Sequence, residues 1–147
     1  PAVEVVQPEG NDTIASPLRD GSATAREVTS TTKISGLQVP TVNDGHWVVT
    51  EYRASGGSGY VVTDDEVWET QSRLAREEGI FTEPAGAVAL AGALRAARDQ
   101  RVDPEANIIC MITGSGFKDP HSVEQMVAST SGAPLISFDE FARLQRE

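Results

Sequence analysis

The feature that most constrains the fold of this chain is the alternation of short apolar runs with helical patterns. Short runs rich in Val, Ile and Leu are typical of strands, and apolar residues repeating every three to four positions are typical of helices. Strands separated by helices predict an α/β fold with three layers, in which helices flank a largely parallel sheet. The expected strands are Ala2–Val6, Gly59–Val62, Asn107–Thr113 and Leu135–Ser137.

The start of each expected helix carries a local signal. Thr63 and Glu66 form the pattern of a capping box, in which each side chain accepts from the backbone N–H of the other residue. Ser137 and Glu140 repeat that pattern before the last helix. The remaining helices are expected from Pro84 to about Gln100 and from Pro120 onward. Over His46–Ala54 the residue types of Trp47–Thr50 favour a strand, but the caps Asp44 and Gly56 favour a helix, which we expect.

Residues 11–45 are mostly polar and rich in Gly, Ser, Thr and Pro, so we expect a loop-rich segment with a short helix within 16–28. The whole chain, residues 1–147, is short enough for a single domain. The sequence begins as if a strand were already under way at Pro1, which predicts that this domain is partial.

Charge and composition exclude several classes of function. Lys and Arg total 12 and Asp and Glu total 22, so the net charge is −10. This charge argues against nucleic acid and anionic membrane as partners, since both repel an acidic surface. The single cysteine, Cys110, allows no internal disulfide and favours the cytoplasm. The sequence has only two histidines, His46 and His121, and one cysteine, so no Cys/His metal site is expected.

Two places in the sequence could carry chemistry. The glycine-rich turn Thr113–Gly116 follows an expected apolar strand, and ligands of parallel sheets bind beyond the C-terminal ends of strands. The alternative is an ordinary turn between a strand and a loop. Glu83 comes directly before Pro84 and is either a site residue or only a helix cap. Cys110 lies inside the apolar run and is expected to be a buried small hydrophobe.

Three segments occur in a fixed order along the chain: Thr63–Glu66, Leu74–Ala87 and Thr113–Pro120. Together they resemble the C-terminal half of threonine synthase, a fold-type II pyridoxal-phosphate (PLP) enzyme of the group that includes threonine dehydratase and cysteine synthase. The resemblance is clear over Val62–Pro120. It implies that the chain is part of the large domain of such an enzyme.

The resemblance also implies roles for individual residues. Thr113 would hydrogen-bond the pyridine nitrogen of PLP, Gly114 and Ser115 would shape the ring pocket, and Glu83 would lie near the face of the cofactor. A hydroxyl partner leaves that nitrogen largely unprotonated, which favours elimination and replacement chemistry.

The family's Schiff-base lysine and its glycine-rich phosphate loop have no counterpart in this sequence. The only lysines are Lys33 and Lys118. Lys118 follows the turn, where the family has a different lysine, so it is expected to be a surface residue or to lie beside a cap. No catalytic lysine is therefore assigned, and PLP would be shared with a missing half.

Two functions fit this sequence. In the first, the chain is the C-terminal portion of a threonine-synthase-like lyase of amino-acid metabolism, acting on a small amino-acid substrate. A complementary N-terminal polypeptide would complete it, and a homo-oligomer is also compatible. In the second, a truncated relative has lost the chemistry and acts as a binding or regulatory subunit.

Overall fold

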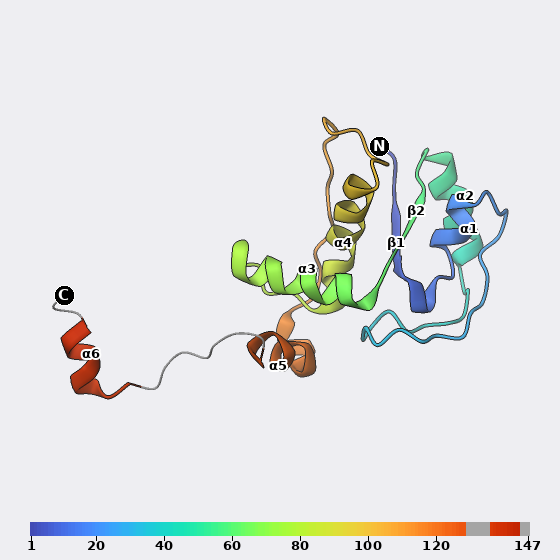
Figure 1. The fold of residues 1–147 in the computed structure, drawn as a ribbon. Coiled ribbons are helices and arrows are strands. Elements are labelled where there is room, and N and C mark those ends of the chain that lie inside the picture. The colour runs from blue at the N-terminus through green and yellow to red at the C-terminus, as the bar shows by residue number, and fades with distance from the viewer. Residues whose placement is uncertain (129–135, 145–147) are drawn as a thin grey trace.

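The computed structural model describes residues 1–128 and 136–144 of the chain. Among these residues, two strands are each followed by successive helices, as Figure 1 shows. In chain order the elements are β1 (Val5–Pro8), a 3-10 helix (Glu9–Asn11), α1 (Ala15–Arg19), α2 (Gly45–Ala54), β2 (Gly59–Val62), α3 (Asp64–Glu77), α4 (Pro84–Arg98), a second 3-10 helix (Gly116–Lys118), α5 (Pro120–Ala128) and α6 (Phe138–Leu144).

Helices lie on both faces of a parallel pair of strands, β1 and β2. Val5 is in register with Gly59, so these two share one face and Val6 lies on the other. On the Val6 face, α4 approaches so closely that a Cβ added to Gly92 would lie 2.3 Å from Val6 Cγ2. On the opposite face, a Cβ added to Gly59 would lie 1.9 Å from the carbonyl oxygen of Ala15 in α1. This arrangement confirms the predicted three-layer α/β fold.

The capping box predicted for α3 is present. Glu66 N–H donates to Thr63 Oγ1 at 3.1 Å, and Thr63 N–H donates to Glu66 Oε2 at 2.9 Å. The buried face of α3 then carries Val67 and Leu74, which pack with Ala87 of α4. Because these side chains share one core cluster with Val62 of β2 and with Ile34, the two long helices and the sheet are fixed relative to one another.

Most of the other local predictions are confirmed. Helix α2 begins one residue before the expected His46, α4 begins at Pro84, and β2 has its predicted bounds. The first strand is displaced, because β1 includes Pro8, which was expected to lie beyond it. A proline can end a strand at the edge of a sheet, since its missing N–H need not pair with a neighbour.

The strand predicted at Asn107–Thr113 is wrong. This run is extended and passes back alongside α4 (Figure 1), but it pairs with no strand among the described residues. Ile109 is 88% exposed and Met111 is 72% exposed. An apolar run with high strand propensity becomes a strand only when a neighbour accepts and donates its ladder hydrogen bonds. The described residues place no such neighbour beside it.

In the C-terminal segment the predicted helix is present, but no strand is described at Leu135–Ser137. Leu135 lies outside the described residues, and residues 136–137 form no strand. Ser137 and Glu140 form the predicted second capping box, with Glu140 N–H donating to Ser137 Oγ at 3.2 Å and Ser137 N–H donating to Glu140 Oε2 at 3.4 Å. Helix α6 buries none of its residues, because no apolar surface among the described residues covers it.

Candidate functional site

The turn Thr113–Gly116 is held against the loop that precedes α4. Thr113 is exposed at the end of the extended apolar run. Gly114 has φ +70°, a conformation that residues with a Cβ rarely adopt. Gly116 is buried, and its N–H donates to the carbonyl oxygen of Phe81 at 3.2 Å. The turn therefore has a fixed backbone and one exposed hydroxyl.

The carbonyl oxygen of Thr113 lies over the first turn of α4. Thr82 Oγ1 donates a hydrogen bond to it at 2.7 Å. A Cβ added to Gly86 would lie 1.8 Å from the same oxygen, so only glycine permits this approach. Thr82 and Gly86 together therefore hold the Thr113 backbone against α4.

Glu83 contacts the turn through its side chain. Glu83 thus lies at the expected cap position of α4, although its side chain does not bond the helix N–H groups. Its Oε1 pairs with Lys118 Nζ at 3.0 Å, and a Cβ added to Gly114 would lie 2.0 Å from Oε1. The carboxylate prefers the ammonium group because a charged partner makes a stronger hydrogen bond than a backbone amide alone.

The end of the turn and the residues after it make further local contacts. Ser115 Oγ accepts from Phe117 N–H at 3.4 Å and caps the 3-10 helix Gly116–Lys118. The Phe117 ring meets the Phe81 ring edge to face, with the centroids 5.0 Å apart. Lys118 is exposed, as expected, although its ion pair with Glu83 was not predicted. All four residues assigned from the sequence, Thr113, Gly114, Ser115 and Glu83, thus belong to one cluster.

The sequence reasoning missed two buried residues of this cluster. Thr82 comes directly before Glu83 in the segment that carries the family resemblance, but the sequence does not say what its hydroxyl contacts. Gln71 lies on α3 between Val67 and Leu74 and is buried with them. A glutamine on an otherwise apolar helix face could have indicated a buried hydrogen-bonding residue, because a buried amide needs partners.

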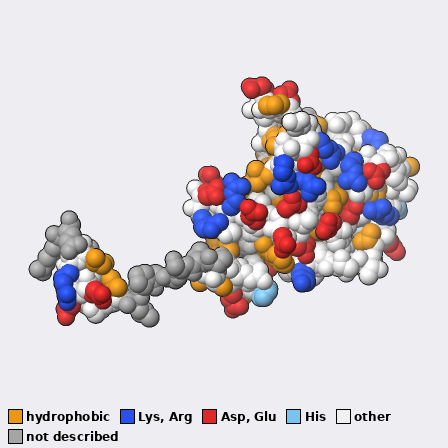
Figure 2. All heavy atoms as spheres, viewed as in Figure 1, with side chains coloured by type: hydrophobic (Ala, Val, Ile, Leu, Met, Phe, Trp, Pro, Cys, Tyr) orange, Lys and Arg blue, Asp and Glu red, His pale blue; other side chains and the backbone are white. Residues whose placement is uncertain are grey.

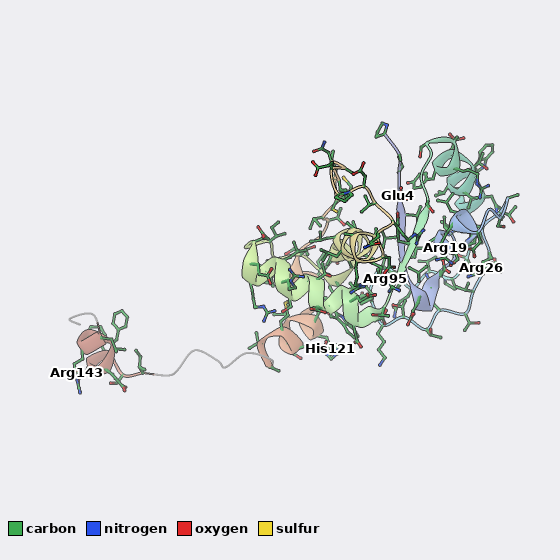
Figure 3. The ribbon with its side chains drawn as sticks, turned by 45° about the horizontal axis from the view of Figure 1, so that its top comes forward. Glu4, Arg19, Arg26, Arg95, His121 and Arg143 are labelled. Atoms are coloured by element: carbon green, nitrogen blue, oxygen red, sulfur yellow. The ribbon has the colours of Figure 1, made fainter. Side chains whose placement is uncertain are left out.

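Cys110 and His121 are the remaining candidates for chemistry. Cys110 is half-buried, and burial raises the pKa of its thiol. His121 lies at the start of α5 (Figure 3), and its Nε2 is 3.0 Å from the amide nitrogen of Gln125. Within residues 1–128 and 136–144, no group of three or more His, Cys, Asp or Glu is placed to hold a metal ion.

A hollow of about 240 Å³ lies between α3 and α4. Figure 2 shows acidic and basic side chains interspersed on the face that it displays, and Figure 3 places Arg95 on α4. Arg95 and Arg98 both pair with Glu66, and Arg73 pairs with Glu77. Since these charges compensate one another, the hollow does not concentrate one sign of charge.

The described residues contain no helix that is both long and apolar enough to cross a membrane.

Comparison with known proteins places the chain among PLP enzymes. Residues 1–114 match the family described as pyridoxal-phosphate dependent enzyme. The threonine synthase of Methanocaldococcus jannaschii is 46% identical over 67 residues, which are 46% of this chain and 16% of that protein. The threonine synthase of Synechocystis is 42% identical over 73 residues, or 50% of this chain and 19% of the relative. That of Methanosarcina acetivorans is 30% identical over 124 residues, which are 84% of this chain and 31% of the relative.

A solved structure agrees at the level of the fold. It is the crystal structure of a mutant of O-ureido-L-serine synthase with O-ureido-L-serine bound. It superposes with a TM-score of 0.59 and 22% identity over 97% of this chain and 38% of that one. The chain thus spans less than a third of the three threonine synthases above and less than half of this structure. Because the family match extends over residues 1–114, more than half of the chain, the protein belongs to the family of pyridoxal-phosphate-dependent enzymes.

Proposed function

We propose that this chain is the C-terminal portion of a PLP-dependent lyase of amino-acid metabolism, similar to threonine synthase, and that a complementary polypeptide completes its active site. The cluster around Thr113 is the observation that carries this proposal. PLP, when bound, supplies an electron sink for bonds at the α carbon of an amino acid. The residues of this chain bind and orient one end of that cofactor.

The turn fits the pyridine-nitrogen end of PLP. The Thr113 hydroxyl is exposed at the turn, and it can donate to an unprotonated ring nitrogen. Ser115 directs its hydroxyl to the backbone of Phe117, and the Glu83 carboxylate fills the place where a side chain at Gly114 would begin, so Glu83 lies directly beside the turn. Glu83 is paired with Lys118, so its negative charge is largely compensated beside the turn.

The other end of the cofactor needs groups from outside this sequence. The lysine that holds PLP must have a free amine at the aldehyde. Lys118 is engaged with Glu83 at the turn itself, and Lys33 lies in the segment between α1 and α2. Ile109 and Met111 are exposed on an extended run that pairs with no strand of residues 1–128 or 136–144, which supports completion by a strand of another polypeptide.

The test is reconstitution of PLP binding. The 147-residue chain is mixed with PLP, alone and together with a complementary polypeptide that carries a Ser-x-Lys segment and a glycine-rich loop. We expect the absorbance of lysine-bound cofactor only in the mixture, mapped by mass spectrometry to a lysine of the complementary polypeptide. A stoichiometric PLP adduct on Lys118 or Lys33 of the isolated chain would contradict the proposal. A stable complex that binds no PLP would instead favour a non-catalytic binding subunit.

The role of Thr113 is tested in the same complex. Thr113→Val keeps the shape of the side chain and removes its hydroxyl, which should weaken PLP binding by about 1–3 kcal/mol, the usual cost of an unpartnered buried polar group. Thr50→Val is the matched control, because it makes the same change at an exposed position of α2. Equal PLP affinity in both variants would refute the assignment.

A further inference from the structure

A chain of hydrogen bonds connects the interior of α3 to the candidate turn. Gln71 is 1% exposed, and its Nε2 donates to the carbonyl oxygen of Thr82 at 2.9 Å. Thr82 is 2% exposed, and its Oγ1 lies 2.7 Å from the carbonyl oxygen of Thr113. The same Nε2 also donates to Ser122 Oγ in α5 at 3.1 Å. One buried amide thus contacts segments before and after the turn.

The orientation of the Gln71 amide is determined by its partners. The carbonyl oxygen of Thr82 can only accept, so the amide nitrogen must face it. The Ser122 hydroxyl donates its proton to the carbonyl oxygen of Asp119 at 3.0 Å, so it accepts from Gln71. Gln71 Oε1 is buried and has no hydrogen-bond partner among the described residues. The side chain therefore makes its two donations despite the cost of a buried, unpaired oxygen.

The Thr82 hydroxyl has a single proton to donate. Two carbonyl oxygens lie near it, that of Thr113 at 2.7 Å and that of Glu83 at 3.3 Å. The shorter contact is typical of a hydroxyl hydrogen bond, and the longer one lies beyond that range. The proton is therefore directed to Thr113, whose own hydroxyl is exposed at the turn.

We propose that Thr82 is a positioning residue for Thr113 and that Gln71 orients Thr82, so that the turn has its binding conformation before PLP arrives. This inference rests on the proposed function of Thr113. A binding group that is already fixed loses less conformational entropy when the cofactor binds. Thr82 is buried and its hydroxyl bonds the backbone of Thr113, so it acts on the cofactor through Thr113.

The first measurement needs no cofactor. Gly116 N–H, bonded to the carbonyl oxygen of Phe81, reports whether the turn is closed. Its hydrogen exchange is followed by NMR in the 15N-labelled 147-residue chain. Thr82→Val should speed this exchange about tenfold, the effect of losing one ordinary hydrogen bond. Thr82→Ser, which keeps the hydroxyl, should exchange at nearly the original rate.

Thr70→Val is the matched control. Thr70 is also a buried threonine, but its hydroxyl donates to the carbonyl oxygen of Glu66 within α3. Thr70→Val should leave the hydrogen exchange of Gly116 N–H unchanged. Unchanged exchange in Thr82→Val, equal acceleration in Thr70→Val, or failure of Thr82→Ser to restore the rate would each overturn the inference. If Thr82→Val does not fold, Thr82→Cys replaces it, because a thiol has similar size and is a weaker donor.

The second measurement separates this inference from the proposed function. In the complex with the complementary polypeptide, Thr82→Val should weaken PLP binding about tenfold, and Thr82→Ser should restore it. If Thr113→Val weakens PLP binding while Thr82→Val changes neither PLP affinity nor Gly116 exchange, the positioning inference alone fails. If Thr82→Val speeds Gly116 exchange while PLP affinity stays the same in Thr82→Val and Thr113→Val, the role of Thr113 fails and the turn is still positioned by Thr82.

Discussion

Glu66 stabilises the fold in two ways, and replacing it by glutamine separates them. Its Oε2 accepts from Thr63 N–H at 2.9 Å, which a glutamine can also do. Its carboxylate also pairs with Arg98 and with Arg95, the latter at 3.3 Å, and only a charged residue can do this. Glu66→Gln therefore keeps the capping box and removes the ion pairs.

The expected magnitude follows from the exposure of these partners. Arg95 is 37% exposed and Arg98 is 62% exposed, so solvent screens both pairs and each contributes only a few tenths of a kcal/mol. A carboxylate in the first turn of a helix adds a similar amount. Glu66→Gln should lower the free energy of unfolding by about 0.5–1.5 kcal/mol at neutral pH. Thr63→Ala, which removes the other half of the cap, should cost about 1 kcal/mol.

The sign of the pH dependence follows from the pKa of Glu66. Burial raises this pKa, but the Thr63 N–H and the guanidinium groups of Arg98 and Arg95 outweigh it and hold it below the usual value. A lowered folded-state pKa means that the ionised group stabilises the fold above the unfolded pKa of about 4.3. This contribution is lost as the pH falls through the folded value. The difference between the wild-type chain and Glu66→Gln should disappear in acid.

The assay is urea denaturation of the chain followed by circular dichroism at several pH values. Glu69→Gln is the matched control, because Glu69 is an exposed acid of the same helix, and it should change stability by less than about 0.5 kcal/mol. Two results would refute the reasoning: equal stability of wild type and Glu66→Gln at neutral pH, or a difference that stays constant down to about pH 2, far below the usual carboxyl pKa.

Three further outcomes are expected. Gly92→Ala should lower the free energy of unfolding by about 1–3 kcal/mol in the same assay, because the new Cβ would lie 2.3 Å from Val6 Cγ2; an unchanged urea midpoint would show that α4 does not pack this closely. Burial raises the pKa of Cys110, so its alkylation by iodoacetamide at neutral pH should be slower than that of a free cysteine and should accelerate as the pH rises; an equal rate would contradict this. Ile109→Lys should weaken association with the complementary polypeptide at least about tenfold without lowering the melting temperature, whereas Trp47→Lys, at a 71% exposed position of α2, should leave association intact.

The family and the local structure could be read from the sequence because their signals are short in range. A capping box depends on two residues three positions apart, as at Thr63 and Glu66, and a proline at a helix start acts on its own turn. The segments that resemble threonine synthase are likewise contiguous. The four proposed cofactor residues came from these segments, and the structure gathers them at one turn.

The tertiary structure decided the contacts between remote segments. Thr82 meets the backbone of Thr113 across 31 positions, Glu83 meets Lys118 across 35, and Gln71 meets Ser122 across 51. No local pattern encodes these pairs, because each depends on how α3, α4 and the turn pack together. The apolar run before Thr113 shows that a local pattern can also predict an element that the tertiary structure does not form. Its composition predicts a strand, but a strand forms only beside a hydrogen-bonding neighbour, and the described part of this chain does not supply one.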